Sequence, residues 1–181
     1  AGCVLANRLS DSRVLAVTLS LGAELLASAG ISADLTSARK MLEKALTSGK
    51  AAEIFDSMVV ALGGPRNFIA THDTHLRKAP IVKPVYADDE GVVSAIKTRD
   101  LGLAVIELGG GRRVAADKIN HAVGLDHLLG KGFRADKNTP LCVIHAQSDD
   151  DFNRAASIIK QAYTVGDAAQ SWPSILERIA P

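Results

Sequence analysis

A run of three glycines and two arginines is the strongest candidate for chemistry in this sequence. Gly109, Gly110, Gly111, Arg112 and Arg113 follow residues 103–108, whose β-branched pattern predicts a strand. Glycines let a backbone approach a ligand closely, and successive backbone N–H groups can bind an anion. Two neighbouring guanidinium groups can also hold a phosphate through paired hydrogen bonds. The alternative interpretation is a mobile loop with solvated arginines. The run is not a nucleotide P-loop, because the Gly-Lys-Ser/Thr ending of that motif is missing.

The histidines do not form a metal or catalytic pattern. His72 and His75 are three residues apart, but a zinc site needs further ligands, and the residues around this pair predict a polar linker. His121, Asp126 and His127 are close in sequence, yet no nucleophile completes a triad with them. We therefore expect no metal site, and surface or structural roles for these histidines.

Two further side chains have both a structural and a functional interpretation. Cys142 lies inside an apolar run, so we expect a core residue rather than a reactive thiol. Lys118 follows an aspartate, as the attachment lysine does in lipoyl-carrying domains, but the Met-Lys-Met pattern of biotin carriers is missing. The alternative for Lys118 is an exposed, unmodified lysine. Because Cys3 is the only other cysteine, we expect a reduced, cytoplasmic protein without disulfides.

Helices are expected over residues 1–65, the first region of the chain. Residues 13–29 are apolar on most of the helix circumference, which is typical of a helix buried from several sides. Gly30 is the expected stop of this helix, and Thr36 is the expected cap of the next one. A third helix is expected to end at the Gly63-Gly64-Pro65 sequence.

The sequence pattern changes after residue 65. Residues 66–80 are polar and predict an irregular linker, and short β-branched runs between glycines then predict strands at 81–86, 91–96, 103–108 and 141–146. Because Pro84 interrupts the first run, this strand should lie at a sheet edge or begin at Val85. Ser148 and Asp151 resemble a capping box and predict a helix. A last short strand is expected at residues 174–179. The fold class is therefore α+β, with a β-rich module and its closing helix at residues 81–181.

The composition excludes several classes of partner. The chain has 181 residues, with 21 Lys and Arg against 20 Asp and Glu, which gives a net charge of +1. This charge provides no overall electrostatic field that would attract nucleic acid or an anionic membrane. Aromatic residues make up only 4%, which leaves few rings for stacking on bases. No apolar run approaches the ~20 residues of a membrane span. We expect neither a nucleic-acid nor a membrane partner.

An ordered set of short motifs covers nearly the whole chain. The motifs are residues 49–55, 83–96, 101–104, 108–113, 117–124 and 141–146. Together they resemble the C-terminal part of the thymidine-cleaving enzymes in the pyrimidine nucleoside phosphorylase family. The resemblance implies that the N-terminal helices come from a larger α/β domain, and that a hammerhead-like β-rich module follows them.

The resemblance also implies an activity for the parent protein, a pentosyltransferase. This activity is the reversible phosphorolysis of thymidine to thymine and 2-deoxyribose 1-phosphate, with phosphate as co-substrate and without a cofactor. In the family, the phosphate is held by a loop of the Lys-His-Ser-Thr-Gly-Gly type in the N-terminal half of the chain. No such loop occurs in these 181 residues. We therefore expect a structural segment, inactive alone, whose partner is the remainder of a homodimeric phosphorylase.

The glycine-arginine run acquires a specific expectation from this resemblance. The matching loop of the family can approach the cleft between the two domains, so residues 109–113 are expected to face that cleft and to help order its closed state. Two alternatives remain open for the chain. One is a carrier module modified at Lys118, and the other is a stand-alone module that binds a phosphorylated ligand at residues 109–113.

Overall fold

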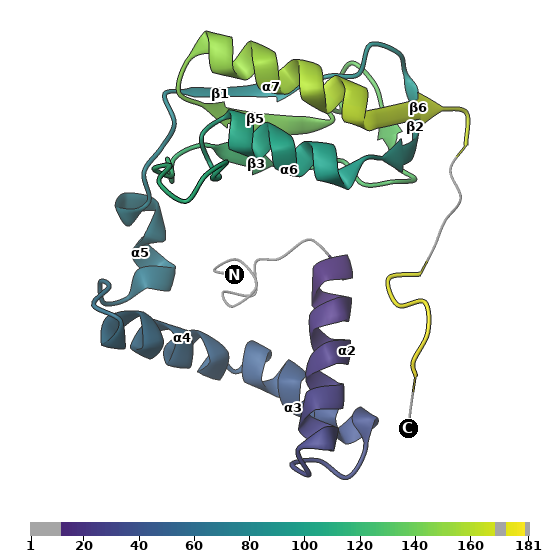
Figure 1. The fold of residues 1–181 in the computed structure, drawn as a ribbon. Coiled ribbons are helices and arrows are strands. Elements are labelled where there is room, and N and C mark those ends of the chain that lie inside the picture. The colour runs from purple at the N-terminus through teal and green to yellow at the C-terminus, as the bar shows by residue number, and fades with distance from the viewer. Residues whose placement is uncertain (1–11, 169–172, 180–181) are drawn as a thin grey trace. The chain divides into compact units, whose positions relative to one another are not determined.

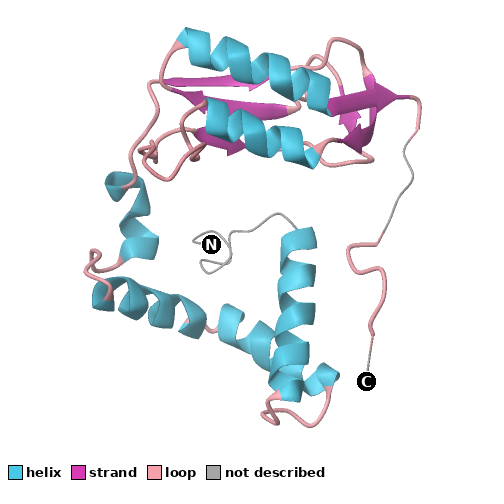
Figure 2. Ribbon diagram, viewed as in Figure 1, coloured by secondary structure: helices cyan, strands magenta, loops and turns pink. Residues whose placement is uncertain are grey.

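The computed structural model describes residues 12–168 and 173–179 and has an α+β fold, as expected (Figures 1 and 2). Contacts divide the described residues into two units. Unit 1 contains residues 12–75 and 173–179, and it is helical over the first of these ranges. Unit 2 contains residues 76–168, and it combines two small antiparallel sheets with two helices.

Four helices form unit 1 in the described part of the chain. They are α2 (Ser12–Ser28), α3 (Leu35–Thr47), α4 (Lys50–Ala61) and α5 (Phe68–His75). Gly30 lies two residues after the end of α2 and adopts a φ of +69°, so this expected stop is confirmed. The cap of α3 is Asp34 rather than Thr36, because the Asp34 carboxylate accepts a hydrogen bond from the backbone N–H of Ser37 at 2.8 Å. The prediction of Thr36 as the cap is therefore wrong.

Helix α2 buries only part of its apolar circumference. Leu19 and Ala23 are buried, whereas Leu21 and Leu25 are 67% and 72% exposed. The helix packs closely on α3, since a Cβ at Gly22 would lie 2.8 Å from a side-chain carbon of Leu42. Part of the apolar circumference that the sequence gives this helix is therefore left uncovered among the described residues.

Helix α5 lies inside the segment that was expected to be an irregular linker. The Asp56 carboxylate of α4 accepts a hydrogen bond from the backbone N–H of Ile69 at 2.9 Å, which satisfies one amide of the first turn. The rings of Phe55 and Phe68 also contact each other, with centroids 6.5 Å apart. These two contacts come from α4, so the linker residues alone could not reveal them.

Unit 2 contains two three-stranded sheets. The strands are β1 (Ile81–Val85), β2 (Gly91–Ile96), β3 (Gly124–Asp126), β4 (Arg134–Ala135), β5 (Cys142–Ala146) and β6 (Tyr163–Gly166). One sheet has the order β1-β5-β3 and the other has the order β4-β2-β6. Strand β1 lies at an edge, which confirms the prediction for the strand that contains Pro84, because proline cannot donate to a second neighbour.

Two of the expected strands are absent from the described residues. Residues 103–108 belong to the C-terminal half of helix α6 (Thr98–Glu107) and its cap, and residues 174–179 form no strand. Helix α6 buries Ala104 and Leu108 and half-buries Leu101, which lie on one helical face. This helical spacing of apolar residues starts before residue 103. The residues from 103 onwards, taken alone, therefore predict a strand.

Helix α7 (Asp149–Ala162) closes unit 2, as the capping-box pattern predicts. The Ser148 hydroxyl accepts a hydrogen bond from the backbone N–H of Asp151 at 3.2 Å. Lys83 of β1 forms an ion pair with Asp149 at 2.6 Å and lies 5.5 Å from the centroid of the Phe152 ring. Helices α6 and α7 lie side by side over the strands (Figure 1). The largest side chains that are fully buried in this core are Leu141, Ile144, Ile159, Val93 and Cys142.

A helix that crosses a membrane must be both long and apolar. None of the helices in the described residues has both the length and the apolar character that a bilayer span requires.

Candidate functional site

The first two glycines of the run cap the C-terminus of helix α6. Gly109 has a φ of +85°, and its N–H donates to the carbonyl of Ile106 at 2.9 Å. The N–H of Gly110 donates to the carbonyl of Val105, also at 2.9 Å. This paired arrangement is a common way to end a helix. It uses two of the backbone donors that an anion-binding loop would otherwise offer.

Close packing explains the other two glycines of the run. A Cβ at Gly110 would lie 3.0 Å from the Val105 side chain and 3.2 Å from the Val105 carbonyl oxygen. A Cβ at Gly111 would lie 2.7 Å from the Ile106 side chain. Backbone conformation and close packing therefore explain why glycine occupies all three positions, without reference to a ligand.

The turn after the glycines is organised by Asp117. Its carboxylate accepts hydrogen bonds from the backbone N–H groups of Arg113 at 2.9 Å and Val114 at 3.1 Å. The bond from Val114, and then that from Arg113, lowers the pKa of Asp117. The loop also returns to the helix end, because the N–H of Asn120 donates to the carbonyl of Gly109 at 2.9 Å. An ionised carboxylate thus holds residues 113–117 in a defined turn.

Glu107 links this loop to both helices of unit 2. Its carboxylate is 27% exposed, forms an ion pair with Arg113, and lies 3.4 Å from Nε of Arg154 on α7. Arg154 in turn pairs with Asp151, which contacts the α7 cap residue Ser148. A chain of charged contacts thereby links the guanidinium of Arg113 to helix α7. No local sequence pattern indicates that Glu107 or Arg154 belongs to this site.

Arg112 and Lys118 are both exposed and belong to the same loop. Neither side chain has a hydrogen-bond or ion-pair partner within residues 12–168 or 173–179. Residues 111–123 contain no strand, so Lys118 does not lie on the β-hairpin tip that a lipoyl or biotinyl attachment site uses. The geometry therefore offers no support for a carrier module.

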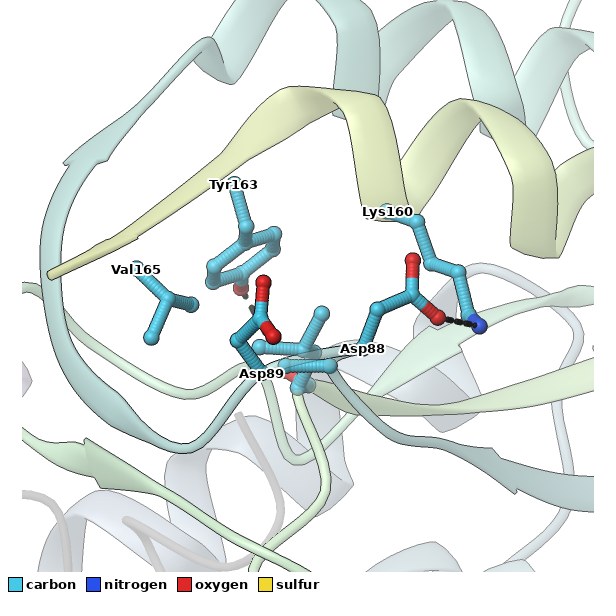
Figure 3. Close-up of a pocket in the computed structure, with 7 residues that line it drawn as sticks. Asp88, Asp89, Lys160, Tyr163 and Val165 are labelled. Atoms are coloured by element: carbon cyan, nitrogen blue, oxygen red, sulfur yellow. Dashed lines mark hydrogen bonds and ion pairs between the residues drawn. The ribbon is translucent and has the colours of Figure 1, made fainter.

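A shallow pocket of about 130 Å³ lies on another part of unit 2 (Figure 3). Residues at the start of the β1–β2 connection and at the junction of α7 with β6 line it, including Asp88, Asp89, Lys160 and Tyr163. Lys160 pairs with Asp88, as Figure 3 shows. None of these residues was selected from the sequence.

Tyr163 forms the buried wall of this pocket. Its hydroxyl donor has two backbone acceptors within reach, the carbonyls of Leu129 at 3.0 Å and Leu141 at 3.3 Å. Burial, together with the nearby Cys142, raises the pKa of Tyr163 to about 12. The hydroxyl is thus neutral and engaged in structure, so it does not serve as a general base or nucleophile in this pocket.

The remaining candidate residues stay apart. His72 and His75 lie on α5, where Nδ1 of His72 is 2.8 Å from the carbonyl oxygen of Ile69, and no cluster of metal-ligating side chains occurs among the described residues. His127 is exposed and pairs with Asp126 at 3.2 Å. Cys142 is a free thiol in the core, as predicted, and burial raises its pKa to about 12. Cys3 lies outside the described residues.

Comparison with known families finds a match over most of unit 2. The family model for the pyrimidine nucleoside phosphorylase C-terminal domain matches residues 92–166. The match runs from β2 to the end of β6, and it includes helix α6, the glycine-arginine loop and helix α7.

Proposed function

Because residues 92–166 belong to the pyrimidine nucleoside phosphorylase C-terminal domain family, we propose that the chain is the C-terminal segment of a thymidine phosphorylase-like enzyme. The complete enzyme catalyses the phosphorolysis of thymidine. A phosphate oxygen forms a bond to the anomeric carbon while the C–N bond to the base breaks. The base leaves with that electron pair and takes up a proton, giving thymine and 2-deoxyribose 1-phosphate. The reaction is reversible and needs no cofactor.

The chain supplies structure rather than the reacting groups in this proposal. Phosphorolysis depends on holding an anionic phosphate against the anomeric carbon while the leaving base is stabilised. Residues 109–113 contain no carboxylate, imidazole or nucleophile that could react at the anomeric carbon, and a Lys-His-Ser-Thr-Gly-Gly loop is missing from the sequence. The remainder of the phosphorylase chain is therefore the partner of this segment, within a cytoplasmic homodimer.

The observation that carries the proposal is the family match, and an activity measurement tests it. The purified chain and the complete enzyme that contains it are each incubated with phosphate and either thymidine or uridine, and the released base is quantified. The complete enzyme is expected to release thymine, and to use uridine less well. The chain alone is expected to release neither base. Thymine release by the chain, above that of a mock purification from the same host, would contradict the structural role.

A further inference from the structure

The two neighbouring arginines of the loop occupy different environments. Arg113 is held twice, because its guanidinium pairs with Glu107 and its backbone N–H donates to Asp117. Arg112 is exposed, and its guanidinium has no partner in the part of the chain that the structure describes. The guanidinium of Arg113 is therefore engaged with Glu107 beside the turn that Asp117 holds, while the charge of Arg112 is available to a ligand.

The backbone N–H groups of the loop also fall into two sets, those that have an acceptor and those that have none. The N–H groups of Gly109 and Gly110 donate into α6, and those of Arg113 and Val114 donate to Asp117. Between these two pairs, the N–H groups of Gly111 and Arg112 have no acceptor among the described residues. Two consecutive backbone donors and a guanidinium group thus occur together at Gly111 and Arg112.

We propose that the N–H groups of Gly111 and Arg112, together with the Arg112 guanidinium, contact the phosphoryl oxygens of the co-substrate, and that Arg113 is the positioning residue for this contact. The proposal rests on the proposed function, since it assigns the loop to the phosphate of that reaction. Guanidinium and consecutive backbone N–H groups suit the oxygens of a phosphate dianion.

The nearby negative charges are already compensated. The Asp117 carboxylate accepts two backbone hydrogen bonds, and Glu107 lies between Arg113 and Arg154. Lys118 adds a further cation to the same loop. The negative end of the α6 dipole opposes an anion, but the N–H groups of Gly109 and Gly110 satisfy two of its terminal carbonyls. The loop around Arg112 therefore carries a positive balance.

Steady-state kinetics of the complete enzyme separate the two arginines. Arg112→Gln is expected to raise the KM for phosphate about tenfold, because a charge-assisted contact to the anion is lost, and to leave the KM for thymidine within about twofold. Arg112→Lys keeps the positive charge, so it should raise the KM for phosphate by less than Arg112→Gln does. Arg113→Gln and Glu107→Gln should each raise the KM for phosphate by less, and the double variant should be no worse than the more affected single variant. An unchanged KM for phosphate in Arg112→Gln would overturn the proposal, as would a larger effect of Arg113→Gln.

A binding measurement on the chain itself keeps the inference separate from the enzyme's activity. The ¹⁵N-labelled chain is titrated with inorganic phosphate, and with sodium chloride at matched ionic strength as the control. The backbone N–H signals of Gly111 and Arg112 are expected to shift with phosphate, and the shift should be lost in Arg112→Gln. A wild-type enzyme without phosphorolysis would refute the proposed function, whereas unshifted signals at these two residues would refute the phosphate contact.

Discussion

Tyr163 connects two segments of unit 2 through a single hydroxyl. The carbonyls of Leu129 and Leu141 both lie within hydrogen-bond distance of it, and the N–H of Leu129 donates to the same Leu141 carbonyl at 2.8 Å. The side chain is 7% exposed, so water cannot easily replace its hydroxyl. Tyr163 therefore joins the loop before β4 to the start of β5.

Removal of this hydroxyl tests its structural role. Tyr163→Phe is expected to lower the free energy of unfolding by about 1–2 kcal/mol, because the Leu129 carbonyl loses its partner while the ring stays in place. Urea denaturation followed by circular dichroism measures the change. Tyr86→Phe is the matched control, because Tyr86 is more exposed, and its effect should stay within about 0.5 kcal/mol. Equal effects of the two substitutions would show that the Tyr163 hydrogen bonds contribute nothing.

Single residues were predictable from the sequence where their neighbours in the chain decide their environment. Cys142 was expected in the core because apolar residues surround it, and it is fully buried. Glu107 was not identified, because its two arginine partners lie six and 47 positions further along the chain and no local pattern joins them. Such a charged contact depends on how α6 packs against α7, which local residue spacing does not reveal.

At the scale of elements, helix α7 shows how strongly one N-terminal cap can contribute to the stability of a unit. The Ser148 hydroxyl accepts a hydrogen bond from the N–H of Asp151 and donates one to the Asp151 carboxylate at 2.6 Å. The same helix buries Ala155, Ile159 and Ala162 against the strands of unit 2. A loosened first turn would therefore affect the whole unit.

Ser148→Ala is expected to destabilise the protein by about 1 kcal/mol, since the N–H of Asp151 loses its acceptor at the start of the helix. Ser157→Ala is the control on the same helix, because Ser157 is exposed and alanine is the better helix former there. Thermal unfolding of both variants, compared with the wild type, measures the difference. A Ser148→Ala midpoint equal to that of Ser157→Ala would contradict the role of the cap.

A helix or strand could be predicted correctly when the residues that determine it lie within that helix or strand. The capping pattern of α7 and the proline of edge strand β1 were sufficient for correct predictions. Helix α6 was mistaken for a strand because Val105 and Ile106, which favour strands, occupy its last turn. Helix α5 was missed because its first-turn acceptor, Asp56, belongs to α4.

At the scale of the whole molecule, the two units differ in the amount of buried apolar surface. Among the described residues, unit 1 buries four apolar side chains, namely Leu19, Ala23, Ala38 and Ile69, whereas the other fourteen buried ones belong to unit 2. No residue of helix α4 is fully buried. Buried apolar surface is the main source of folding free energy, so unit 1 should be the less stable unit.

Hydrogen exchange of the intact chain tests this difference. Backbone amides of β5 and α7 are expected to exchange at least about tenfold more slowly than those of α2 and α4, because opening the unit 2 core exposes more apolar surface. Mass spectrometry of peptic peptides gives both rates in one experiment, and the same peptides in concentrated urea provide the unprotected reference. If α2 peptides kept their protection as long as α7 peptides, the two units would unfold together, and the buried core of unit 2 would not set the order of stability.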